Sequence, residues 1–299
     1  MLIILGLILF EVITSVDHAI INADVLRTMQ PRYRKWFLIW GILIGVFLIR
    51  GLLPWMIVWA STPTLGAWGA LVASFNSDSG AIQAIESSAP ILLIGGGTYL
   101  LFLFLHWYFV EPKKYGLIGE RVVQRFSIWF FAVASVALTA IVWFALHKQV
   151  MMAFGAVIGS TAFFITHGFK SNAEQQEEKL KKKGASDLSK VFYLEVIDST
   201  FSIDSVLGAF AFTFSIPLIL IGNGIGALIV RQLTIKGTAQ IRKYRYIKNG
   251  AMYSIFFLGG IMILESFGMH FPGWVSPSIT FLVVGYFFLK SKRAASAAA

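Results

Sequence analysis

The sequence contains two similar acidic motifs, Glu11-Val-Ile-Thr-Ser-Val-Asp17-His18-Ala-Ile-Ile-Asn22 and Glu195-Val-Ile-Asp198-Ser-Thr-Phe-Ser-Ile-Asp204-Ser205. Each motif lies in an otherwise apolar stretch that is long enough to cross a bilayer. A carboxylate near the bilayer centre costs about 2.5–3.5 kcal/mol on insertion scales. Five carboxylates at that depth therefore require compensating partners, and the partner that we expect is a bound cation.

The composition places the chain in a membrane. Its 299 residues are 57% hydrophobic and 13% charged, and the mean hydropathy is +0.74, whereas soluble domains have about 25% charged residues. This composition excludes a soluble enzyme. The chain has no cysteine, so disulfides and thiolate metal sites are excluded too. The net charge of +10 is interpreted as a topology signal and not as a sign of nucleic-acid binding.

Apolar stretches of about 20 residues predict an all-α bundle of nine transmembrane helices. They cover residues 2–26, 36–59, 90–110, 126–147, 150–167, 191–212, 217–233, 250–267 and 274–290. The expected organisation is a first transmembrane half, a charged cytoplasmic linker, a second transmembrane half and a disordered tail, at residues 1–167, 168–190, 191–293 and 294–299.

The basic residues predict the orientation of these spans. The loops after the first, third, fifth and seventh spans, together with the C-terminal tail, hold all of the 25 Lys and Arg residues except Arg50 and Lys148. Because such loops face the cytoplasm, we expect the N-terminus outside and the C-terminus inside, in a bacterial or archaeal cytoplasmic membrane. Arg50 lies within the second span and is expected to be the one buried cation, which either pairs with Asp24 or Glu11 or caps the outer vestibule.

The two motifs are expected to belong to an inverted repeat, since they lie in spans of opposite direction. Transporters built from such repeats bind substrate and ions near the bilayer midplane, at the interface between the repeats.

A further sequence feature, Gly95-Gly-Gly97, predicts close helix packing rather than phosphate binding.

Helix geometry groups some of the acidic residues and separates others. Glu11, His18 and Asn22 fall within about 40° of one another on an ideal helix. Glu195 and Asp198 share a face, but Asp204 lies on the opposite side. We therefore expect the second helix to be kinked or unwound so that its three acids reach one site. The alternative is that Asp204 faces a different helix and has another role.

The residue types in these motifs predict a divalent-metal site. Carboxylate oxygens suit magnesium, calcium and manganese, and a histidine favours manganese, iron or zinc. His18 is either a ligand or a hydrogen-bonded structural residue. The same carboxylates bind either protons or metal, so proton exchange is expected. The candidate ligands are Glu11, Asp17, His18, Asn22, Glu195, Asp198, Asp204 and Ser205.

The second motif, continued through Val-Leu-Gly-Ala-Phe-Ala-Phe-Thr213, resembles the signature helix of the TerC (tellurite resistance) superfamily of integral membrane proteins. The first motif resembles the first acidic helix of that family. Glu86-Ser-Ser-Ala-Pro90 and Arg50-Gly-Leu-Leu-Pro54 are similar to one TerC-like branch in particular.

This resemblance implies membership of a transporter group, several of whose members export manganese or other divalent cations. In one respect the chain departs from the family, which usually has Asn where this sequence has His18, and the identity of the ion is therefore open. The family's acidic residues correspond here to Glu11, Asp17, Glu195, Asp198 and Asp204.

The sequence therefore predicts a transporter that exports a divalent cation, manganese first, with the metal ion, the bilayer and protons as partners and no nucleic acid. One alternative is a membrane scaffold or metal-sensing protein with a structural ion. The other is an intramembrane metal-dependent enzyme, for which we find no nucleophile–base pair or HExxH helix. His106 and His167, near the inner ends of their spans, are expected to be interfacial.

Overall fold

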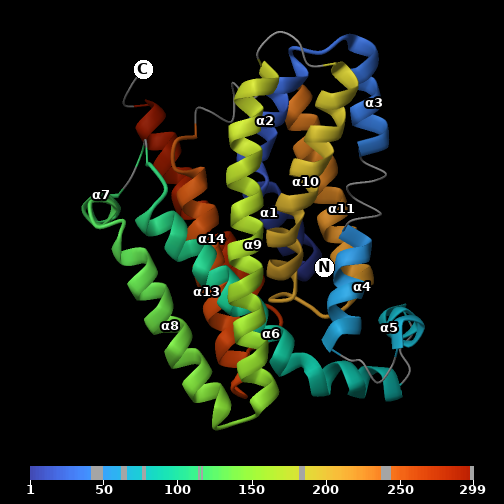
Figure 1. Cartoon of the computed structure of the whole chain (residues 1–299), viewed down its shortest axis with the longest axis vertical. Helices are drawn as coiled ribbons and strands as arrows, with labels where there is room; N and C mark the ends of the chain where they lie inside the picture. The colour runs from blue at the N-terminus through green and yellow to red at the C-terminus, as the bar shows by residue number, and fades with distance from the viewer. Residues whose placement is uncertain are drawn as a thin grey trace.

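The computed structural model describes the backbone of the whole chain except residues 42–49, 62–65, 76–78, 114, 116, 182–185, 237–243 and 297–299. The side chains of Asp17, His18 and Arg50 also lie outside the described part. Within that part all regular structure is helical (Figure 1). The helices are α1 Leu2–Thr14, α2 Val16–Leu26, α3 Pro31–Gly41, α4 Arg50–Ser61, α5 Gly66–Phe75, α6 Ser79–Phe109, α7 Ile118–Gln124, α8 Trp129–Leu146, α9 Val150–Lys181, α10 Asp187–Ala209, α11 Ile216–Lys236, α13 Ile247–Ser266 and α14 Val275–Ser296.

Several helices have the length and apolar composition needed to cross a membrane, which confirms the predicted class of membrane-embedded helical bundle. In the described residues these spans are Ser87–Phe109, Trp129–Leu146, Val150–Asn172, Ile216–Thr234 and Ile247–Ser266. The other four predicted spans coincide with α1–α2, α3–α4, α10 and α14. The full nine-span topology and the inverted repeat stay predictions.

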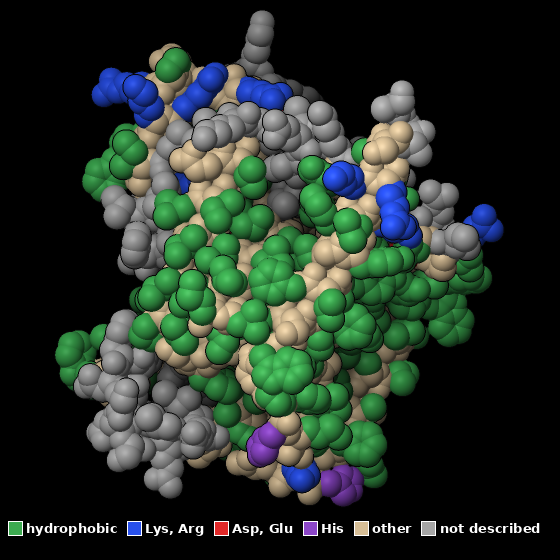
Figure 2. All heavy atoms as spheres, turned by 180° about the vertical axis from the view of Figure 1, so that it is seen from behind, with side chains coloured by type: hydrophobic (Ala, Val, Ile, Leu, Met, Phe, Trp, Pro, Cys, Tyr) green, Lys and Arg blue, Asp and Glu red, His purple; other side chains and the backbone are tan. Residues whose placement is uncertain are grey.

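The outer surface of the bundle is apolar. On α8, at the periphery of the molecule (Figure 1), Val136 is 70% exposed and Trp143 is 62% exposed. Figure 2 shows a broad hydrophobic face with Lys and Arg side chains gathered mainly at one end. Large apolar side chains exposed over a whole face are typical of helices that contact lipid rather than water.

The connections between helices agree with that view. Figure 1 places the α2–α3 connection, the C-terminal end of α9 and the C-terminal end of α14 towards the same end of the molecule. All three segments are basic in sequence and were expected to face the cytoplasm. The orientation in the membrane remains a prediction that this arrangement supports.

Glycines allow the helices of the bundle to approach closely. A Cβ added to Gly159 on α9 would overlap the carbonyl oxygen of Gly95 on α6, and a Cβ on Gly97 would lie 2.9 Å from the carbonyl oxygen of Gly259 on α13. Small residues at such crossings are common in membrane proteins. The predicted packing role of Gly95-Gly-Gly97 is confirmed.

Two helices that were predicted to run in the same direction do so. Leu7 on α1 faces Gly222 on α11, and Glu11, one turn later, faces Gly226, where a Cβ would lie 2.6 Å from the glutamate Cβ. Both contact positions advance together along the chain, so α1 and α11 pack in parallel. This packing leaves Glu11 with no exposed surface.

Candidate functional site

The two acidic helices lie next to each other and run antiparallel. α10 contacts α2, α1, α9 and α11. The C-terminal end of α2 meets the N-terminal end of α10, where Lys190 Nζ donates to Thr28 Oγ1 at 3.1 Å and the backbone N–H of Gln30 donates to Asp187 Oδ2 at 3.0 Å. The antiparallel arrangement is what an inverted repeat requires.

The first motif is divided between two helices. α1 ends at Thr14 and α2 begins at Val16, with Ser15 between them at φ −91° and ψ −1°. The Ser15 hydroxyl donates to Glu11 Oε1 at 2.8 Å. Further along α2, the Asn22 side chain is 6% exposed, and its Oδ1 accepts no hydrogen bond from any described group. The side chains of the predicted ligands Asp17 and His18 lie outside the described residues.

An arginine from α11 lies next to both acids at the start of the second motif. Arg231 Nη2 lies 3.3 Å from Asp198 Oδ2 and 3.8 Å from Glu195 Oε1. Its Nη1 donates to the carbonyl oxygen of Phe37 at 2.8 Å, and the guanidinium lies 4.7 Å from the centre of the Phe37 ring. The guanidinium is thereby held between α10, α11 and α3.

Tight packing around this group leaves no spare volume on the α3 side. A Cβ added to Gly41, at the end of α3, would overlap both Glu195 Oε1 and Arg231 Nη1. Glycine is therefore the residue that lets α3 approach the ion pair, and the carboxylate and guanidinium are confined by backbone as well as by charge.

A lysine from α9 and a tyrosine from α6 hold the third acid of the second motif. Lys170 Nζ lies 2.5 Å from Asp204 Oδ2, and the Tyr99 hydroxyl donates to Asp204 Oδ1. The same hydroxyl lies 3.0 Å from Thr166 Oγ1. Asp204 is 8% exposed and Lys170 is 9% exposed, so this is a buried ion pair in the interior of the bundle.

The expectation that the second motif is locally unwound was wrong. α10 is continuous from Asp187 to Ala209, and the hydroxyls of Ser199 and Ser202 donate to the carbonyl oxygens of Glu195 and Asp198 four residues earlier. Asp204 therefore remains on the opposite side of α10, where Lys170 neutralises it without any change in the backbone. Ser205, another predicted ligand, donates its hydroxyl to the carbonyl oxygen of Ser202 at 3.0 Å.

The expectation of a single buried cation at Arg50 was also wrong. Lys170, Lys190 and Arg231 are all 7–9% exposed. Lys170 was missed because α9 continues as one helix to Lys181, beyond the apolar stretch that ended at residue 167. Arg231 lies inside the predicted span 217–233, so its burial could have been predicted from the sequence. The topology argument instead assigns its charge to the loop that follows the span.

The described side chains do not themselves form a complete metal site. In the described part of the chain, no three His, Asp or Glu side chains come together in a way that holds a metal ion. Basic residues occupy positions next to Glu195, Asp198 and Asp204, and a metal at these carboxylates competes with them. The predicted set of metal ligands, which includes the undescribed Asp17 and His18, stays a prediction.

Comparison with known proteins gives a family and no function. The family model described as "Protein of unknown function (DUF475)" matches residues 16–297, so the chain belongs to this family. No curated protein and no solved structure matches the chain.

Proposed function

We propose that this member of the DUF475 family is a membrane transporter that exports a divalent cation, with manganese as the first candidate. The observation that carries the proposal is the group in which one guanidinium, Arg231, faces two carboxylates, Glu195 and Asp198, inside a bundle with an apolar outer surface. Ionisable residues at such depth mark ion pathways in membrane proteins.

The charge balance of this group favours a divalent ion. Among the described side chains, two ionised carboxylates against one guanidinium leave one formal negative charge. The contacts to Asp198 and Glu195, at 3.3 and 3.8 Å, are longer than the roughly 2.7–2.9 Å of a strong charge-assisted hydrogen bond. A doubly charged ion can therefore take over both carboxylates and leave Arg231 with its contact to the Phe37 carbonyl.

The facing helices carry further oxygen atoms of the kind that such an ion prefers. α1 and α2 bring the buried Glu11 and the Oδ1 atom of Asn22 to the side of the bundle that α10 and α11 also contact. The sequence adds Asp17 and His18 in the same segment. A set of carboxylate and amide oxygens with one imidazole suits manganese better than calcium or magnesium.

In this proposal Asp204 and Ser205 do not belong to the cation site. The Asp204 carboxylate faces α6 and α9, whereas Glu195 and Asp198 face α11 and α3. The contacts of Asp204 therefore favour the alternative that helix geometry left open, in which Asp204 faces a different helix and has another role.

The arrangement of the helices supports transport rather than a static ion. α2 and α10 pack antiparallel with the carboxylates between two halves of the chain, as in transporters that rock about a central site. The TerC resemblance supports the same class of protein. We propose the predicted orientation as well, with the N-terminus outside and the C-terminus in the cytoplasm of a bacterial or archaeal membrane.

The test combines metal binding with metal flux. Calorimetry on the purified protein should show manganese binding that Glu195→Gln and Asp198→Asn each weaken at least tenfold, whereas Glu265→Gln, at the end of α13, has little effect. Proteoliposomes should then show manganese movement that both site variants slow. Binding without flux would favour the scaffold or sensor alternative, and unchanged affinity in both variants would reject the site.

A further inference from the structure

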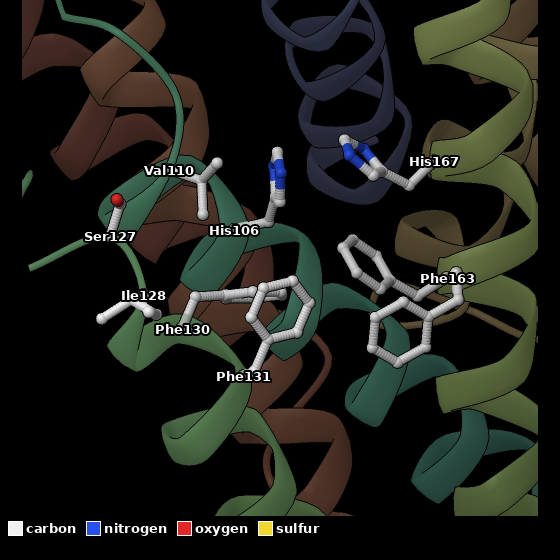
Figure 3. A pocket seen from close by; sticks show the side chains of 9 residues that line it. His106, Val110, Ser127, Ile128, Phe130, Phe131, Phe163 and His167 are labelled. Carbon is white, nitrogen blue, oxygen red and sulfur yellow. The ribbon is translucent and has the colours of Figure 1, made fainter.

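Two histidines line a pocket on the surface of the bundle, away from the proposed cation site. The pocket has a volume of about 400 Å³, and His106 of α6 and His167 of α9 lie side by side at one end of it, above a set of phenylalanine rings (Figure 3). On its rim Ile128 is 79% exposed and Phe131 is 62% exposed, so the pocket opens at the surface of the bundle. His106 and His167 lie near the predicted cytoplasmic ends of their helices.

The two imidazoles are close enough to interact directly. Their ring centres are 3.9 Å apart, and the ring planes are inclined by 51°. His167 also stacks on Phe163, with an interplanar angle of 8°, which fixes the side of α9 from which the ring projects. Three residues further on, Lys170 projects from the same face of α9, because positions i and i+3 are neighbours on a helix.

Lys170 follows His167 of the pocket by three residues on α9 and reaches into the interior. Its ammonium group lies 2.5 Å from Asp204, and Asp204 also accepts from Tyr99, whose hydroxyl is 3.0 Å from Thr166. Groups with exchangeable protons thus extend from the surface pocket to the buried carboxylate on α10. None of these side chains contacts Arg231, Glu195 or Asp198 through a described hydrogen bond or ion pair.

We propose that Asp204 is the proton-carrying site of this transporter and that the His106–His167 pocket is the exit through which its proton reaches the cytoplasm. The inference rests on the proposed function in so far as the proton is the ion exchanged for the metal. It separates the two ions: the metal binds at Glu195 and Asp198, and the proton binds at Asp204 on the opposite side of α10.

The proton step balances without any further reactant. The Asp204 carboxylate accepts a proton that arrives from the outer side and becomes a neutral acid, while Lys170 stays an ammonium ion. Asp204 then gives its proton to one ring nitrogen of the imidazole pair, which releases another proton to the cytoplasm from its second nitrogen, and the ion pair is restored. The proposed route includes a water molecule between Asp204 and His167, since bridging waters join polar groups that are too far apart for a direct hydrogen bond.

The groups that face Asp204 and the histidines come from three helices. Among the described side chains these titratable groups are Tyr99 and His106 on α6, His167 and Lys170 on α9, and Asp204 itself on α10. The Asp17 side chain lies outside the described part of α2, a helix that also contacts α9 and α10.

One experiment tests the route without metal. The chain has five histidines, so selective ¹⁵N-histidine labelling gives a spectrum that single substitutions can assign. In lipid nanodiscs, titrated from about pH 4 to pH 9 around the ordinary histidine value, the midpoint of His167 should move by about one pH unit in Asp204→Asn, which removes the carboxylate charge and keeps the Lys170 ammonium. The double variant Lys170→Met/Asp204→Asn removes both charges, so it should fold and should move the midpoint less. An unchanged midpoint in folded Asp204→Asn would overturn the proposal.

A second experiment measures coupling. In proteoliposomes with an internal pH dye, manganese movement by the native chain should be accompanied by opposite proton movement. The double variant should keep manganese affinity within about twofold but lose at least tenfold in protons moved per manganese, and His106→Gln/His167→Gln should slow proton movement similarly. His147→Gln, at the exposed end of α8, is the control.

The outcomes separate the two proposals. Protons moved at the native ratio by the double variant would refute the role of Asp204, and loss of manganese affinity in that variant would place Asp204 in the metal site. If the native chain binds no manganese, the proposed function fails, and the titration without metal still decides whether the pocket and the ion pair act together.

Discussion

Removal of the Arg231 guanidinium tests the proposed cation site most directly. Arg231→Met keeps most of the side-chain volume but leaves Glu195 and Asp198 without their cationic partner and the Phe37 carbonyl without its donor. Breaking a buried ion pair by removing one partner costs about 3–5 kcal/mol. We expect a loss of that size in the free energy of unfolding, since the side chains of all three charged residues are at most 16% exposed.

The proposed function adds a second expectation to the same variant. If manganese binds at these carboxylates, it replaces the missing positive charge and should restore stability, by about 2.7 kcal/mol at a concentration of 100 times the dissociation constant. The apparent affinity for manganese should also rise, because the metal no longer competes with the guanidinium. Magnesium, tested at the same concentration, shows whether the rescue depends on the type of metal.

The assay is unfolding in mixed detergent micelles, followed by circular dichroism, with and without manganese. Arg245→Met is the matched control because Arg245 is exposed and stacks on Tyr115 at 4.8 Å, and such surface changes stay within about 0.5 kcal/mol. The neutral triple variant Arg231→Met/Glu195→Gln/Asp198→Asn should recover most of the lost stability and lose the manganese effect. A loss below about 1 kcal/mol in Arg231→Met would refute the energetic reasoning, and an absence of rescue by manganese would refute the metal site.

Three other predictions follow from the packing and the topology. Gly41→Ala should lower the free energy of unfolding by about 1–3 kcal/mol in the same assay, the usual range for overpacking, because the added methyl group overlaps the ion pair. An unchanged free energy of unfolding would mean that α3 can move away from the ion pair. Thr28→Cys/Lys190→Cys, in a chain without native cysteine, should cross-link α2 to α10 under mild oxidation and block manganese flux while leaving binding intact. Continued flux in the cross-linked protein would exclude movement of these ends. A reporter fused after Lys183 should be cytoplasmic and one inserted near Asn76 extracytoplasmic, so finding both on one side would reject the nine-span topology.

Part of the site could be predicted from the sequence because it depends on local rules. The 3.6-residue period of a helix places Glu195 and Asp198 on one face and Asp204 on the other, and the structure keeps them there. The conclusion drawn from that geometry, that α10 must unwind, failed because it assumed one shared partner for all three acids. The break in the first motif at Ser15 had no clear signal, since serine is common within membrane helices.

The sequence by itself determined that the chain is a helical membrane protein, where its apolar helices lie and that the run Gly95-Gly-Gly97 allows close packing. Those properties follow from hydropathy, the helical period and residue size. Each of these can be judged from a stretch of sequence about one helix long. Only the tertiary structure decided which base neutralises which acid. Arg231 reaches Glu195 and Asp198 from α11, and Lys170 reaches Asp204 from a part of α9 that had been assigned to a solvated linker. The physical reason is that helix geometry fixes the face on which a side chain projects, whereas the partner across that face depends on how distant helices pack.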